Sequence, residues 1–162
     1  MVPRPRKIPS VGDWRWPGDR GERYADDWHA RDKFLMLPAS EALEYFESNW
    51  LSARECLDYM PAIPFQYYIF AFADFILDPA RRDYAEELAG IANSFLDLLI
   101  DKLTNEPAHL LSVMEDLWPV AEYAYKNSRG SEFEAEVFGS GLDKLAQIRR
   151  LYAEALKSSA AM

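Results

Sequence analysis

Few residues in this chain are typical of catalytic or metal chemistry. It contains two histidines, His29 and His109, and one cysteine, Cys56. Three aspartates surround His29 in the sequence: Asp26, Asp27 and Asp32. Carboxylates with an imidazole can hold a divalent ion, but a solvated surface turn explains this group equally well, and we favour it. No His-x-x-x-His, Cys-x-x-Cys or calcium-loop pattern occurs, so we predict no metal and no cofactor.

Asp74 is the most unusual carboxylate, because it lies inside an apolar segment. A buried ion is costly unless it is paired, so Asp74 either lies at a polar seam beside an Arg or Tyr, or has a raised pKa suited to acid–base chemistry. We favour the seam. The alternative is a ligand pocket between helices that uses Asp74 and Tyr68. His109, beside Leu110 and Leu111, is expected to be a structural histidine.

The N-terminal residues 1–21 contain too many prolines and glycines for a regular element, and we expect an extended arm. The arm includes Asp13-Trp14-Arg15-Trp16. We favour Trp14 and Trp16 packing back onto the helices as a lid. The alternative is an exposed anchor for a partner, since Trp and Arg dominate binding hot spots.

A second candidate surface is the acidic run formed by Glu132, Glu134 and Glu136. These residues alternate with Phe133 and Val137, so the run could offer a basic partner both charge and apolar contact. We favour a solvated helix start, because Ser131 and Glu134 fit a capping box and negative charge is stabilised there.

Composition indicates one globular domain. The 162 residues are 49 % hydrophobic and 14 % aromatic, enough to fill a core. A single cysteine makes an internal disulfide impossible. No apolar run typical of a secretory signal follows the basic start, and no segment reaches transmembrane length. We therefore expect a cytoplasmic protein that does not bind membranes. The net charge is −9, with a net +3 through Arg23 and −12 beyond it. An acidic body disfavours nucleic acid and favours a basic protein partner.

The fold is expected to be all-α, with about six to seven helices bundled around a buried central helix over 64–77. That helix is apolar on every face, so it must be covered on every side. We predict further helices near 22–30, 39–59, 80–103 and 107–126, where Pro119 kinks or divides the last, and near 142–157. The expected organisation is an arm (1–21), one helical domain (22–157) and a frayed tail (158–162).

The segment Pro61-Ala62-Ile63-Pro64-Phe65-Gln66-Tyr67-Tyr68, with the run Ile69-Phe70-Ala71-Phe72 and the early Val2-Pro3-Arg4-Pro5, resembles a bacterial family with a domain of unknown function. That family has a Pro-rich arm and a segment close to Leu-x-Pro-x-Ala-Phe-Arg-Tyr-Tyr-Leu-Pro-Ala-Phe. The resemblance covers the first half of the chain and implies a small bacterial helical domain. Gln66 replaces the family's arginine and Phe70 replaces its proline, so no catalytic residue carries over.

These observations predict a non-enzymatic, acidic protein that binds another protein, as immunity proteins neutralise toxin domains. Its binding residues would be Trp14 and Trp16 or the acids Glu132 to Glu136. One alternative is an enzyme or small-ligand binder with a pocket near Asp74. Another is a homo-oligomeric structural protein, so a homodimer remains open.

Overall fold

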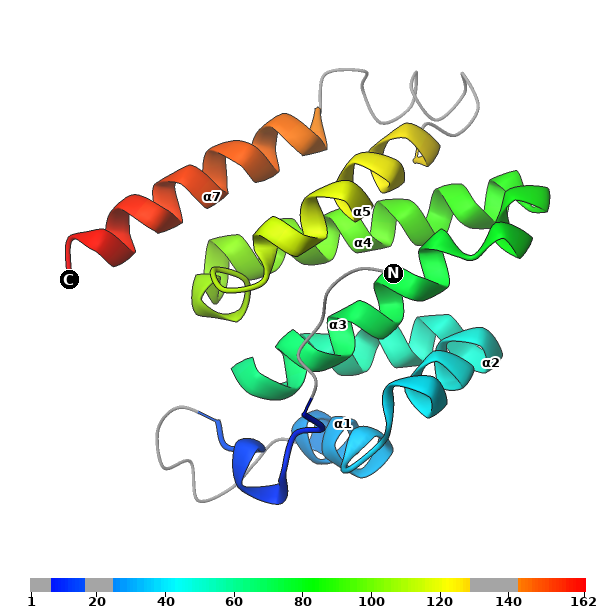
Figure 1. Cartoon of the computed structure of the whole chain (residues 1–162), viewed down its shortest axis with the longest axis horizontal. Coiled ribbons are helices and arrows are strands. Elements are labelled where there is room, and N and C mark those ends of the chain that lie inside the picture. Colours follow the sequence, from blue (N-terminus) through cyan, green and yellow to red (C-terminus); the bar gives the residue numbers. More distant parts are fainter. Residues whose placement is uncertain (1–6, 17–24, 129–142) are drawn as a thin grey trace. The chain divides into compact units, whose positions relative to one another are not determined.

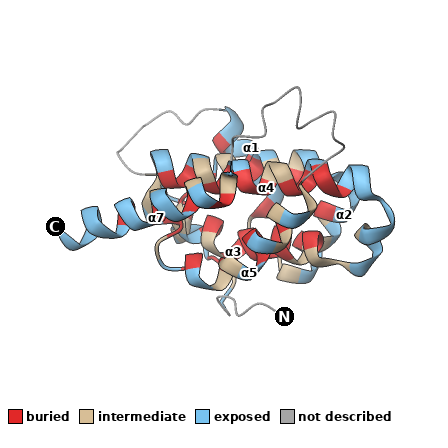
Figure 2. Cartoon of the chain, turned by 90° about the horizontal axis from the view of Figure 1, so that it is seen from above, coloured by how far each residue is buried: buried red, intermediate tan, exposed pale blue. Residues whose placement is uncertain are grey.

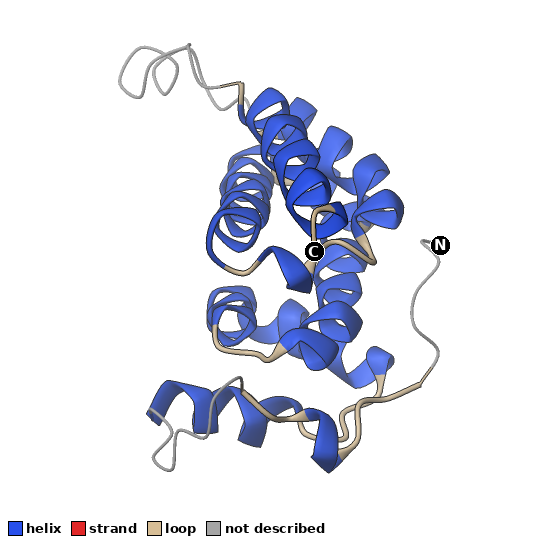
Figure 3. Cartoon of the chain, turned by 90° about the vertical axis from the view of Figure 1, so that its left-hand side faces the viewer, coloured by secondary structure: helices blue, strands red, loops and turns tan. Residues whose placement is uncertain are grey.

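The structure, a computed structural model, describes residues 7–16, 25–128 and 143–162. The described residues form helices and turns without a strand, which confirms the all-α fold class (Figure 3). The α-helices are α1 (Ala25–Phe34), α2 (Ala39–Asp58), α3 (Ala62–Leu77), α4 (Ala85–Asn105), α5 (Met114–Asn127) and α7 (Lys144–Ala160) (Figure 1). The described residues also include three short 3₁₀ helices: η1 (Val11–Asp13) in the arm before α1, η2 (Pro79–Asp83) between α3 and α4, and η3 (Pro107–His109) between α4 and α5.

By compactness the chain divides into two units, residues 1–75 and 76–162. The first unit holds α1, α2 and nearly all of α3, and the second holds α4, α5 and α7. None of the described helices combines the length and apolarity that crossing a bilayer requires.

Most of the apolar helix α3 is buried, as the sequence predicted, although Ile63 in its first turn is exposed. Its aromatic side chains at Phe65, Tyr68, Phe70, Phe72 and Phe75 are fully buried. The helix begins at Ala62 rather than 64, because Pro61 O already accepts the Phe65 N–H at 3.0 Å. Pro64 therefore lies in the first turn, where its missing N–H leaves no bond unmade.

Aromatic rings join α1, α2 and α3 into one core in the first unit. Phe46 of α2 stacks on Phe72 of α3 at 5.0 Å between ring centroids, and Phe34 of α1 lies 4.9 Å from Tyr68. The Tyr68 hydroxyl donates to the carbonyls of Phe34 (2.6 Å) and Leu37 (2.9 Å). Burial is the main cause that raises the pKa of Tyr68, so the hydroxyl keeps its proton. Its two hydrogen bonds hold the turn between α1 and α2.

The helix α2 bends at Asn49, where the backbone leaves helical geometry (φ −157°, ψ 73°). The Asn49 side chain accepts the Ser52 N–H at 3.3 Å, as a helix N-cap does. Asn49 thus ends one helical segment and starts the next within the helix that the sequence predicted near 39–59.

In the second unit, α4 packs against both α5 and α7 through a stripe of buried leucine, isoleucine and phenylalanine. The helix starts at Ala85, five residues later than predicted, because η2 occupies 79–83. Asp78 caps η2 by accepting the Ala80 N–H at 3.0 Å. On α7, buried and exposed residues alternate along the helix, as expected for an amphipathic segment (Figure 2).

The structure also decides between the two alternatives for Pro119 and moves the start of the tail. Pro119 was expected to kink the helix or divide it, and the division is excluded, because α5 continues from Met114 to Asn127. The tail was expected to fray from 158, but α7 continues to Ala160.

Candidate functional site

An acidic surface with an exposed tyrosine lies in the first unit, where α1 begins and α2 ends. We call Asp26, Asp27, Glu55, Asp58 and Tyr59 the acidic–aromatic face. Asp26 and Asp27 lie in the first turn of α1, Asp58 is the last residue of α2, and Tyr59 is its C-cap. Because α1 and α2 pack together, acids that are distant in the sequence come close to one phenol ring.

Nearby negative charges act on the hydroxyl of Tyr59, a residue that is 41 % exposed. The negative charge of Asp26 is the main cause that raises the pKa of Tyr59, and partial burial adds to it. Asp58, Glu55 and Asp27 raise the pKa further. Asp58 is ion-paired with Arg54, and Asp27 is buried, so the exposed negative charge of this face comes from Asp26 and Glu55. Exposed carboxylates of this kind attract a cation.

The arm supports this face through its two tryptophans. Trp14 is buried, with its ring 6.4 Å from that of Tyr68, whereas Trp16 is half-buried. The Trp16 indole N–H donates to Tyr59 O at 2.7 Å, and the two indole rings lie 6.3 Å apart. Trp14 and Trp16 therefore pack against the helices, and Trp16 lies beside the acidic–aromatic face at Tyr59.

The other predicted site residues do not join this face. Glu132, Glu134 and Glu136 lie outside the described residues. Asp74 is half-buried on α3. Tyr68 is six residues earlier on the same helix, so the two side chains project in different directions and α3 alone does not bring them together.

His109 is buried in η3, as expected for a structural histidine. Its Nε2 lies 3.5 Å from Glu106 Oε2, and the other Glu106 oxygen accepts from buried Lys102 at 2.6 Å. Glu106 and His109 have the Glu-x-x-His spacing of some metal sites, which the sequence analysis missed. Within the described ranges, no three His, Cys, Asp or Glu side chains come together as a metal site would need.

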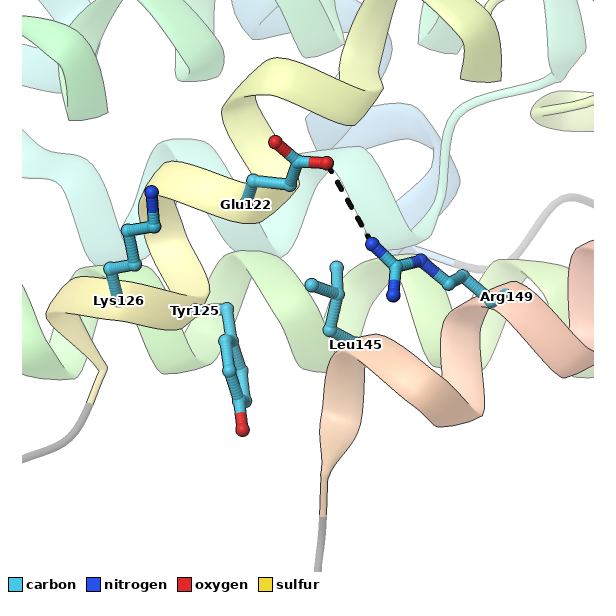
Figure 4. Close-up of a pocket in the computed structure, with 5 residues that line it drawn as sticks. All are labelled: Glu122, Tyr125, Lys126, Leu145 and Arg149. Atoms are coloured by element: carbon cyan, nitrogen blue, oxygen red, sulfur yellow. Dashed lines mark ion pairs between the residues drawn. The ribbon is translucent and has the colours of Figure 1, made fainter.

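A pocket of about 430 Å³ lies between α5 and α7 in the second unit (Figure 4). It is lined by Glu122, Tyr125, Lys126, Leu145 and Arg149. Arg149 Nη2 lies 3.7 Å from Glu122 Oε1, across the gap between the helices. These residues were not predicted as a site, because their sequence pattern is that of ordinary solvated positions on two amphipathic helices.

Comparison of the chain with protein-family models, curated proteins and solved structures found no match. Function is therefore inferred from the residues and their arrangement.

Proposed function

We propose that this chain is a non-enzymatic, acidic protein that binds a basic partner protein and blocks it, in the manner of immunity proteins that neutralise toxin domains. The observation that supports the proposal most is the acidic–aromatic face, where the exposed acids Asp26 and Glu55 accompany the exposed Tyr59. In this proposal the chain is cytoplasmic and belongs to the bacterial family that its first half resembles.

The binding mechanism follows from the two kinds of group on the face. Carboxylates at Asp26 and Glu55 steer a basic surface into contact and raise the association rate. The Tyr59 ring then offers a flat apolar surface on which an arginine or lysine of the partner can lie. Trp16 fixes this end of α2 through its bond to Tyr59 O, so the ring is positioned before binding.

The predicted roles of Trp14 and Trp16 now separate. Trp14 is 1 % exposed, so we assign it to positioning the arm rather than to contact with a partner. We assign Trp16 to the edge of the binding face. The acids Glu132, Glu134 and Glu136 remain a second proposed contact region.

The test is affinity capture of the tagged chain from its native cells. A face variant carries Asp26→Asn with Glu55→Gln. A matched control variant carries Glu41→Gln with Glu44→Gln, which removes two exposed charges from the far half of α2. We expect one basic protein to be recovered in near-equal amount with the native chain and the control, and to be lost with the face variant. Recovery of the chain alone, or of a partner that both variants retain, would contradict the proposal.

A further inference from the structure

The pocket between α5 and α7 is held open by contacts at both of its ends. At the far end, the Tyr152 hydroxyl lies 3.1 Å from Glu115 Oε1, and its ring meets Trp118 edge-on at 5.8 Å. The Glu122–Arg149 pair comes next along the two antiparallel helices. The pocket lies beyond this pair, between the last turns of α5 and the first turns of α7. There, side chains of α4 contact both helices.

At the end of the pocket formed by the last turn of α5 and the first turn of α7, side chains of α4 bond to each of these two helices. The Asn93 amide donates to Ser128 O, which ends α5, at 3.1 Å. The Asn93 side-chain oxygen lies 3.3 Å from Lys144 Nζ, and Asp97 accepts from the same ammonium at 2.8 Å. Asn93 therefore fixes the last turn of one wall and the first turn of the other, which makes the pocket pre-formed. Its volume lies within the range of sites for small molecules.

The lining combines an apolar base with positive charge. Leu145 is buried and Tyr125 is half-buried, whereas Lys126 and Arg149 are exposed. Over the described parts of the chain, Lys126 makes no ion pair with a carboxylate. The Arg149–Glu122 pair is loose, with both side chains more than half exposed, and contributes little. Arg149 can therefore exchange Glu122 for the carboxylate of a ligand.

We propose that this pocket binds a small organic carboxylate with an apolar body. The carboxylate would lie between Arg149 and Lys126, because the guanidinium fork matches two carboxylate oxygens. The apolar body would lie on Leu145 and the Tyr125 ring. Two cations against one acid are unusual in a chain of net charge −9, and they give this pocket a preference for anions. This site is independent of the proposed protein-binding face, which lies in the other unit.

The test uses phenylacetate as the probe and phenylacetamide, its neutral analogue of the same shape, as the matched ligand control. Amide resonances of the isotope-labelled full chain are followed during titration up to about 10 mM. We expect phenylacetate to shift resonances of residues 122–126 and 145–149, and the amide to bind about tenfold more weakly.

Three variants make the assignment specific. Arg149→Gln should weaken phenylacetate binding about tenfold, and Glu122→Gln should tighten it, because Arg149 loses its competing carboxylate. Arg150→Gln, next in sequence but paired with Glu154 at 3.7 Å, should change nothing. The proposal is overturned by no binding, by equal binding of phenylacetamide, by shifts elsewhere in the chain, or by equal effects of Arg149→Gln and Arg150→Gln.

Discussion

Among the residues that the structure describes, Met36 is the non-glycine residue with a positive φ. It has φ 58°, in the left-handed region, and its side chain is 53 % exposed in the turn between α1 and α2. This conformation costs a non-glycine residue about 1 kcal/mol. Tyr68 maintains it, because the Tyr68 hydroxyl donates to carbonyls on both sides of Met36.

We expect Met36→Gly to raise the free energy of unfolding by about 0.5–1 kcal/mol, because glycine adopts this φ without steric cost. Met36→Ala is the control, since alanine keeps the Cβ and the strain while losing the side chain. Urea unfolding of both variants measures the difference. If the two variants have equal stability, backbone strain at Met36 is not the cause.

Cys56 is buried, and desolvation raises its pKa from 9.0 to about 11. Two pKa units reduce the thiolate fraction near neutral pH about a hundredfold, so the native chain should react with a disulfide reagent at least that much more slowly than the unfolded chain. The raised pKa also makes the free energy of unfolding depend on pH. The unfolded thiol loses its proton near pH 9 and the native one near pH 11, so stability falls as the pH rises through this window. Equal reaction rates in buffer and in urea would show that Cys56 is accessible.

The bend in α2 is capped by one polar side chain, that of Asn49. Asn49→Ala removes the cap on the Ser52 N–H and should lower the free energy of unfolding by about 1 kcal/mol. Asn49→Asp keeps a side-chain oxygen acceptor at the start of the second segment and should be nearly neutral. Thermal unfolding followed by circular dichroism measures both variants. An alanine variant as stable as the native chain would mean that α2 straightens when the cap is lost.

The helices were predictable because their cause is local. The segment over 64–77, apolar on every face, predicted α3, and helical periodicity over 80–103 predicted α4. The five-residue error at the start of α4 has a local cause as well, since the Asp78 cap and Pro79 favour a 3₁₀ turn before the helix.

The candidate sites were not predictable in the same way, because their parts are distant in the sequence. The acids of α1 meet Tyr59 only when α1 packs on the end of α2. The pocket needs α5 and α7 to be held by Asn93 of α4, and nothing in the local pattern marks that asparagine. Trp14 and Trp16 were found from composition alone, since tryptophans are unexpected in an arm rich in proline and glycine.

At the scale of the whole molecule, the net charge of −9 and the acidic–aromatic face predict binding that is driven by charge. The association rate with a basic partner should fall steeply as salt rises, since exposed charges are screened over about 8 Å at physiological ionic strength. The face variant should lose most of this salt dependence, whereas the control variant at Glu41 and Glu44 should keep it. Stopped-flow measurements at several salt concentrations would show the difference.

The most direct test of the proposed function is a hydrogen-exchange footprint of the chain in complex with its captured partner. Amides within 25–33 and 50–60 should become protected relative to the free chain, because these segments carry the acidic–aromatic face. Amides of α4 serve as the internal reference and should be unchanged. Protection confined to the second unit, with exchange at 25–33 and 50–60 unaltered, would contradict the assignment of this face as the binding surface.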